Sequence, residues 1–147
     1  MEICHACAEV VSLQAWVANN LGVQSGVGNY WLPIVLTAKG PLYAEVIGQD
    51  DQSPTGYRQP ISLKDSQRQP LYRLARELLA HLSAPPATYM LQFGWWGETL
   101  VYDRLYPFPA APAVASLGIQ KPDLFECHWR CLTAQPIFDI LILASQC

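Results

Sequence analysis

Apolar residues recur with a helical period in two parts of the chain. Over residues 70–83 they form one unbroken stripe, and charged residues occupy the opposite side. The stripe consists of Leu71, Leu74, Ala75, Leu78, Leu79 and Leu82. This pattern predicts an amphipathic helix, and Pro70 suits its first position because a proline there loses no hydrogen bond. A second stripe predicts a helix over residues 3–20, and Gly22 follows it as a natural stop.

Other parts of the chain are rich in aromatic and β-branched residues and are divided by turn residues, which is typical of strands. Predicted strands cover residues 30–38, 42–47, 125–132 and 137–143, and two more flank a glycine-bounded turn at 94–97. Pro33 predicts that its strand lies at a sheet edge or starts after the proline. The apolar run 137–143 also fits a short buried helix, and its β-branched residues favour a strand.

Short turns between successive predicted strands favour antiparallel pairing, and the chain shows no β-α-β alternation that would indicate a parallel sheet. We therefore expect an α+β fold of two layers. Its mostly antiparallel sheet should have four to six strands, with two main helices packed on one face. With 147 residues, the chain is expected to form one globular domain over residues 1–147.

The predicted turn has an unusual composition, because its two glycines enclose Trp95 and Trp96. Turns mostly carry glycine, proline and small polar residues. Neighbouring residues in extended structure point to opposite faces, so at least one of these tryptophans is expected to be exposed. We expect a contact surface formed by Trp95 and Trp96 together with Tyr106 and Phe108, which begin the proline-rich segment that follows.

Composition narrows the function classes. Hydrophobic residues make up 51% of the chain and charged residues 14%, against roughly 25% charged residues in an ordinary domain. So few charges predict that some surface is covered by a second copy, a protein partner or a ligand. The net charge of −3 and the dispersed basic residues argue against nucleic-acid binding. The longest apolar run is far shorter than the roughly 20 residues of a membrane span.

The N-terminus has no positively charged region before its apolar residues, so we expect no signal peptide and a cytoplasmic location. The chain has a distinctive composition: lysine is scarce, glutamine and tryptophan are abundant, and a proline-rich segment runs from Pro107 to Pro112. In this overall composition the chain resembles small uncharacterised cyanobacterial proteins. The resemblance includes no diagnostic motif and implies no activity.

The five cysteines are expected to be thiols or metal ligands, because disulfides are rare in the cytoplasm. Cys4, His5 and Cys7 form a possible but weak metal-binding group. In a strand, Cys127 and Cys131 would lie on one face roughly 13 Å apart, too far for one ion whose bonds to sulfur are about 2.3 Å. We therefore expect no metal and no cofactor, and a buried face formed by Phe125, Cys127, Trp129 and Cys131.

The opposite face of the same predicted strand would carry Glu126, His128 and Arg130 about 7 Å apart. A carboxylate, an imidazole and a guanidinium in a row could orient the histidine for acid–base catalysis. The row is equally what a solvent-facing strand looks like, since no paired nucleophile is visible in the sequence.

These observations predict a binding or assembly module rather than an enzyme, acting through the aromatic hairpin tip. The alternative is a small-molecule-binding enzyme or lyase-like protein with a pocket lined by tryptophans and by Glu126, His128 and Arg130. A weaker alternative is a zinc or thiol protein. No catalytic or cofactor motif distinguishes these possibilities.

Overall fold

The fold is built around a seven-stranded sheet within residues 2–143, the part of the chain that the computed structural model describes. The strands follow the order β1-β7-β6-β2-β4-β5, and β3 also pairs with β2. They are β1 (Gln24–Ser25), β2 (Tyr30–Thr37), β3 (Gly40–Tyr43), β4 (Val46–Gln49), β5 (Tyr57–Ile61), β6 (Ala87–Trp96) and β7 (Thr99–Tyr106). The β1–β7 pair is parallel and the other pairs are antiparallel.

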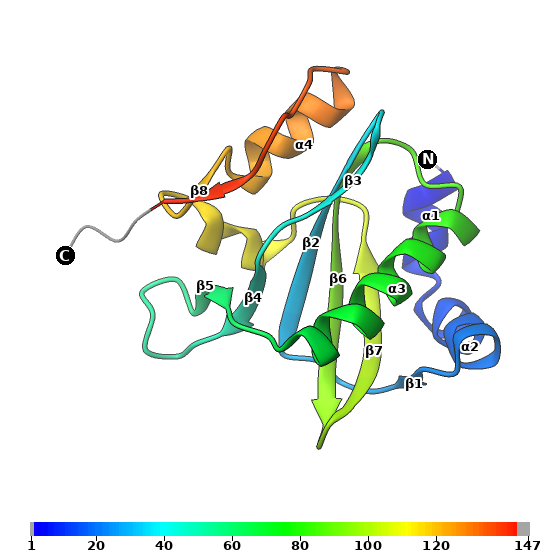
Figure 1. The fold of residues 1–147 in the computed structure, drawn as a ribbon. Helices are drawn as coiled ribbons and strands as arrows, with labels where there is room; N and C mark the ends of the chain where they lie inside the picture. The colour runs from blue at the N-terminus through cyan, green and yellow to red at the C-terminus, as the bar shows by residue number, and fades with distance from the viewer. Residues whose placement is uncertain (1, 144–147) are drawn as a thin grey trace.

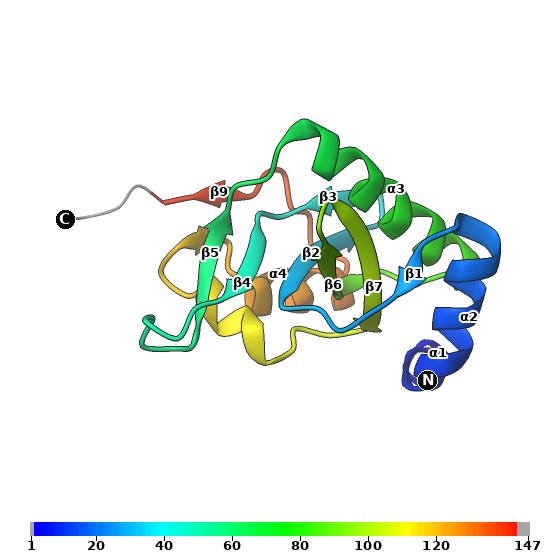
Figure 2. The same cartoon turned by 90° about the horizontal axis from the view of Figure 1, so that it is seen from below.

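Helices lie on both faces of this sheet (Figures 1 and 2). On one side, α3 (Asp65–His81) crosses the face, and α1 (Glu2–Ala8) and α2 (Val10–Leu21) pack at its β7 end and join the same core. On the other side lie the 3-10 helix η1 (Ala111–Ser116) and α4 (Leu124–Leu132). The predicted α+β class with a mostly antiparallel sheet is confirmed. The number of strands and the placement of helices on one face differ from the prediction.

The central strand β6 shows why the sheet has two covered faces. Tyr89 and Leu91 pack into the core beneath α3, whereas Met90 packs into the core beneath α4. All three side chains are fully buried. Successive residues of a strand point to opposite faces, so an apolar run without alternation is the pattern of a strand buried on both sides.

Both predicted helices form, with different bounds. The helix α3 begins at Asp65, before the proline expected to open it, and the Gln67 side chain accepts the Lys64 N–H at 2.9 Å. The N-terminal helix is divided at Glu9 into α1 and α2. Gly22 ends α2 as predicted, with φ 67° and its N–H donated to the Ala18 carbonyl. A left-handed residue in this place favours glycine.

Pro33 lies inside β2, which has neighbours on both sides, so the predicted edge position is wrong. The Pro33 carbonyl accepts the Ala44 N–H at 3.0 Å. The N–H and C=O of one strand residue point to the same side. Pro33, which lacks an N–H, therefore faces the gap between β3 and β4, where β2 has no continuous partner strand.

The hairpin of β6 and β7 forms, but its turn lies at Gly97 and Glu98. Trp95 pairs with Leu100 and Trp96 with Thr99, so both tryptophans belong to the strand rather than to the turn as predicted. Gly97, the first turn residue, has φ 63°, a conformation that glycine adopts more easily than other residues. The aromatic residues therefore extend the ladder up to a two-residue turn.

Residues 125–132 are helical, which contradicts the predicted strand. The Asp123 side chain accepts the Glu126 N–H at 2.9 Å and caps the start of α4. Leu124, Cys127 and Cys131 recur at spacings of three and four and are buried in the core beneath the helix. Phe125 and Trp129, predicted to share a buried face with the cysteines, are exposed.

In the last described part of the chain, the predicted strand 137–143 is reduced to β9 (Leu141–Ile142), which pairs with β8 (Gln120–Lys121) in a separate small sheet. Among residues 2–143, no helix has both the length and the apolar character needed to cross a membrane.

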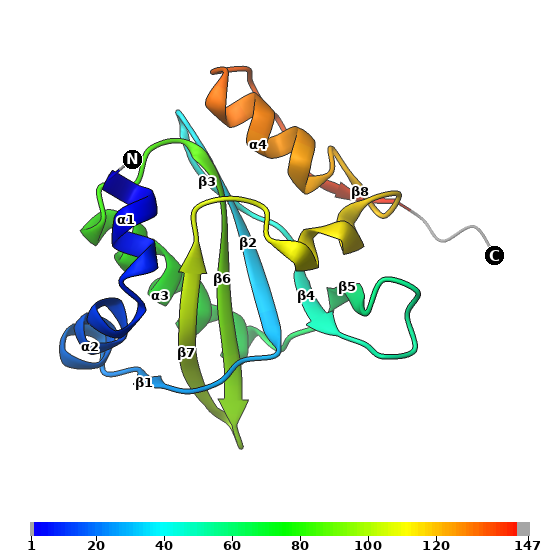
Figure 3. The ribbon, with the colours of Figure 1, turned by 180° about the vertical axis from the view of Figure 1, so that it is seen from behind.

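The connector between α2 and β2 packs closely against the hairpin (Figure 3). The Gly28 N–H is donated to Asp103 Oδ2 at 3.0 Å, and Gln92 Nε2 donates to the Gly28 carbonyl at 2.7 Å. A Cβ on Gly28 would overlap the Phe93 carbonyl. Only glycine allows this approach of two backbones, so the connector has a fixed course across β7 and β6.

Candidate functional site

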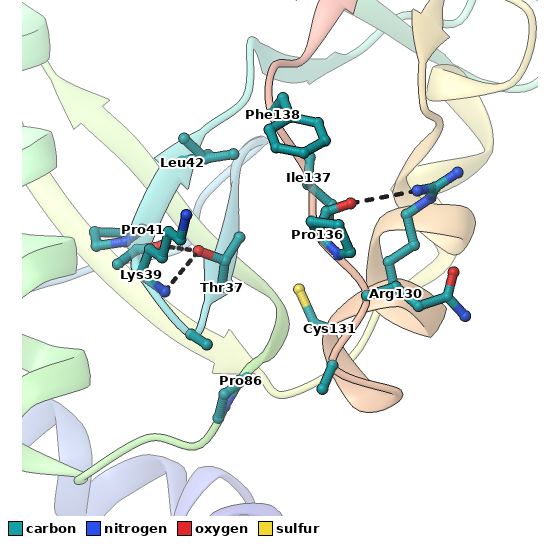
Figure 4. A pocket seen from close by; sticks show the side chains of 14 residues that line it. Thr37, Lys39, Pro41, Leu42, Pro86, Arg130, Cys131, Pro136, Ile137 and Phe138 are labelled. Carbon is teal, nitrogen blue, oxygen red and sulfur yellow. Dashed lines mark hydrogen bonds between the residues drawn. The ribbon is translucent and has the colours of Figure 1, made fainter.

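A pocket of about 420 Å³ opens between the β2–β3 hairpin and the segment that follows α4 (Figure 4). Sites for small organic ligands span roughly 300–1,000 Å³. The hairpin provides residues 37–42, the end of α4 provides Arg130 and Cys131, the segment after it provides residues 134–138, and Pro86 comes from the segment before β6. The pocket therefore joins three parts of the chain that are far apart in the sequence.

The hairpin wall is held by its own turn. Thr37 Oγ1 donates to the Gly40 carbonyl at 2.8 Å and accepts the Lys39 N–H at 3.1 Å. Gly40 has φ 125°, a conformation that side chains disfavour. These contacts fix the backbone of Lys39 at the tip of the hairpin, where the residue is exposed at the rim of the pocket.

The opposite wall is held by Arg130. Its Nη2 lies 2.8 Å from Glu126 Oε2, and its Nη1 donates to the Pro136 carbonyl at 3.3 Å. In Figure 4 this guanidinium lies across the Pro136–Ile137 backbone from the hairpin. The Gln135 N–H is donated to the Arg130 carbonyl at 2.8 Å. Arg130 therefore supports this wall from behind. The pocket itself is lined by the apolar side chains of Leu42, Pro136 and Ile137.

The charges around the pocket are unbalanced. Its ionisable lining residues are Lys39, Arg130 and Cys131, and none of the lining residues that the structure describes is acidic. Burial raises the pKa of the Cys131 thiol, which therefore stays uncharged near neutral pH. The interior is thus apolar, and positive charge lies at its border.

The predicted row of Glu126, His128 and Arg130 does not form, because the segment is a helix. Glu126 and Arg130 lie one turn apart and form an ion pair with each other. His128 faces the sheet, where its Nδ1 accepts the Thr88 N–H at 3.1 Å, and burial lowers its pKa. Only Arg130 of these three lines the pocket, and no lining residue is a tryptophan.

The structure does not bring the four predicted contact residues together. Trp95 is half-buried against Phe93, with ring centroids 5.8 Å apart, whereas Trp96 is 54% exposed. Tyr106 and Phe108 lie at the other end of β7, where the Tyr106 hydroxyl donates to Gln92 Oε1 at 3.2 Å. The expectation that at least one of the two tryptophans is exposed is confirmed, and Tyr106 lies at the opposite end of the hairpin strand from both of them.

The cysteines have separate environments. Cys4 and His5 are exposed on α1, while Cys7 is buried, and burial raises its pKa to about 11. Cys127 and Cys131 lie one helical turn apart instead of along a strand, so the distance argument against a shared ion no longer applies. Within residues 2–143 no three His, Cys, Asp or Glu side chains gather as a metal site. The absence of zinc stays a prediction.

The pocket was not predicted from the sequence. The predicted strands 30–38 and 42–47 meet at this hairpin, where β2 pairs with β3, but nothing local links the hairpin to residues 130–138. The capping pattern Asp123-x-x-Glu126 was the available sign that a helix begins there.

No protein-family model matches the sequence, and no curated protein matches it either. Solved structures share the fold. Glycinamide-RNase-transformylase T from Mycobacterium tuberculosis has a TM-score of 0.71 and 17% identity over 89% of this chain and 50% of its own. N5-carboxyaminoimidazole ribonucleotide synthetase from Thermotoga maritima has a TM-score of 0.63 and 14% identity over 82% of this chain and 33% of its own.

The corresponding synthetase from Staphylococcus aureus, complexed with ADP, has a TM-score of 0.65 and 10% identity over 81% of this chain and 34% of its own. The chain thus spans half of the transformylase and about a third of each synthetase. At these identities the likeness is one of fold. The compositional resemblance to cyanobacterial proteins finds no support in these comparisons.

The fold corrects the predicted function. A protein-binding or assembly module acting through the hairpin tip is contradicted, because the solved structures that share the fold of this chain are described as a transformylase and synthetases. The alternative of a small-molecule-binding enzyme agrees better with this likeness, although the pocket has a different lining from the one expected.

Proposed function

We propose that this chain is the small-molecule-binding portion of an enzyme with an ATP-grasp-type ligase fold, and that the pocket between the β2–β3 hairpin and α4 is its ligand site. The observation that carries this proposal is the pocket of about 420 Å³ between two walls held by hydrogen bonds. An apolar cavity with a few polar groups at its border is the usual form of such a site.

The fold supports an enzyme of this type. Solved structures that share it include a synthase described as complexed with ATP and a synthetase described as complexed with ADP. Because the chain spans a third to half of such proteins, the proposal is limited to a ligand-binding portion. ATP and ADP are therefore among the first compounds to test.

Ligand binding can be tested by titration calorimetry with ATP, ADP and a panel of small apolar acids and amides. Ala38 lines the pocket and is exposed, so Ala38→Trp should fill the space without disturbing the core. Ala18→Trp, at an exposed position on α2, is the matched control. We expect at least one compound to bind the native chain and Ala18→Trp equally and to lose about tenfold or more with Ala38→Trp, a change of about 1.4 kcal/mol.

Two results would overturn the proposal. One is the absence of binding by every compound at millimolar concentration. The other is binding that Ala38→Trp leaves unchanged, which would locate the ligand elsewhere. Circular dichroism of both variants establishes that any loss does not come from unfolding.

A further inference from the structure

We infer that the ligand of this pocket is an apolar molecule with a single anionic group, which Lys39 binds at the rim. The inference rests on the proposed function, because it assigns a chemical class to the ligand of the same pocket. It follows from the sign of the charges in the lining, the state of each charge and the apolar character of the interior.

The described lining of the pocket favours a negatively charged ligand, because it carries positive charge and no acidic side chain. Lys39 lies at the border of the space, the guanidinium of Arg130 lies behind the Pro136–Ile137 backbone, and the described lining residues include no carboxylate. Cys131, the remaining ionisable lining residue, has its pKa raised by burial and carries no charge near neutral pH. A cationic ligand would therefore find no opposite charge among the described lining residues.

The two cations differ in their availability. The guanidinium of Arg130 is already paired with Glu126 at 2.8 Å and also donates to the Pro136 carbonyl. Among the ion pairs of residues 2–143, none involves Lys39. Lys39 therefore offers the charge that a ligand can use, and its ammonium has three donors on a flexible chain.

The backbone beneath Lys39 is well positioned for this role. Thr37 bonds to both the Lys39 N–H and the Gly40 carbonyl, so the turn that carries the lysine is fixed. The side chain starts at the border between solvent and the apolar interior. A ligand with its apolar part against Leu42 and Ile137 can place an acidic group at this border while the group stays partly hydrated.

One cation and an apolar interior favour a single anionic group over a chain of phosphates. A nucleoside diphosphate carries several charges, and each would need a cation or water that this lining does not provide in its interior. A carboxylate on a ring or an acyl chain needs one donor group and apolar contact. This is the arrangement that the pocket offers.

Acid and amide pairs of the same shape test the inference directly. The probes are octanoate and octanamide, naphthoate and naphthamide, and ADP, titrated into the native chain. We expect each acid to bind about tenfold more tightly than its amide, the size expected of one charge-assisted hydrogen bond. ADP should bind more weakly than either acid.

Lys39→Met should reduce binding of the acids to the level of the amides and leave the amides unchanged. Lys64→Met is the matched control, because Lys64 is exposed at the start of α3 and does not line the pocket. Equal binding of acid and amide to the native chain would overturn the inference, as would tighter binding of ADP or an equal loss of acid and amide in Lys39→Met.

The Ala38→Trp variant separates this failure from a failure of the proposed function. If acid and amide bind equally and Ala38→Trp abolishes both, the pocket is a ligand site and only the assignment of an anionic group is wrong. If the acids bind and Ala38→Trp has no effect, both the site and the inference are wrong.

Discussion

Trp129 projects from α4 with 62% of its surface exposed, while Cys127 and Cys131 on the same helix are buried. Large aromatic residues usually contribute to stability through burial. Here the small thiols fill the space beneath the helix, and the indole lies outside. The helical period places positions 127 and 131 toward the sheet and position 129 to the side.

The exposure of Trp129 predicts that Trp129→Ala changes the free energy of unfolding by no more than about 0.5 kcal/mol, the usual range at surface positions. Phe93→Ala is the control, because Phe93 is fully buried and truncation of a buried phenylalanine typically costs about 3–5 kcal/mol. Urea unfolding of both variants measures the difference. A loss for Trp129→Ala as large as that for Phe93→Ala would show that the indole is covered in solution.

At the scale of elements, α4 determines much of the candidate site. It carries Arg130 and Cys131 to the pocket, and its N-terminus depends on the Asp123 side chain that accepts the Glu126 N–H. The helix has nine residues, and helices this short depend on capping and packing rather than on intrinsic propensity. A loss of the cap should therefore affect both stability and the pocket wall.

We expect Asp123→Ala to lower the free energy of unfolding by about 0.5–2 kcal/mol, the range for removal of an N-cap side chain. Asp123→Ser should retain most of the stability, because a hydroxyl also accepts the N–H. Asp51→Ala, at an exposed loop position, serves as the charge-matched control and should be near neutral. Chemical denaturation distinguishes these outcomes, and equal effects of Asp123→Ala and Asp51→Ala would contradict the role of the cap.

At the scale of the whole molecule, most of the large exposed apolar side chains lie between Leu117 and Leu143. The exposed residues in this part of the described chain are Leu117, Ile119, Phe125, Trp129, Leu132, Phe138, Leu141, Ile142 and Leu143. Monomeric proteins rarely expose large contiguous apolar patches, and many exposed apolar residues within one stretch of the chain favour such a patch. This distribution agrees with the charge-poor composition, which predicts that part of the surface is covered.

Self-association through such surface therefore stays a prediction. Light scattering at high micromolar concentration should report a mass above that of a 16.4 kDa monomer. The apparent mass should fall on dilution, because association depends on protein concentration. A concentration-independent monomer would contradict the prediction.

The sequence by itself determined the features that depend on neighbouring residues. The leucine stripe of α3, the glycine that ends α2 and the pairing of β6 with β7 follow from local periodicity and turn preferences. The same local information predicted an α+β fold with a mostly antiparallel sheet. It failed at residues 125–132, because apolar residues there fit both a helical and an alternating pattern and the helix depends on a cap from Asp123, outside the segment.

The tertiary structure alone decided which surfaces are covered and where a pocket can form. It buries β2 and β6 on both faces and tolerates Pro33 in the interior of the sheet, because the missing N–H falls opposite a break in the neighbouring strands. It also brings the hairpin at residues 37–42 beside residues 130–138. Such contacts between distant segments depend on the packing of whole layers, and neither periodicity nor motif spacing encodes them.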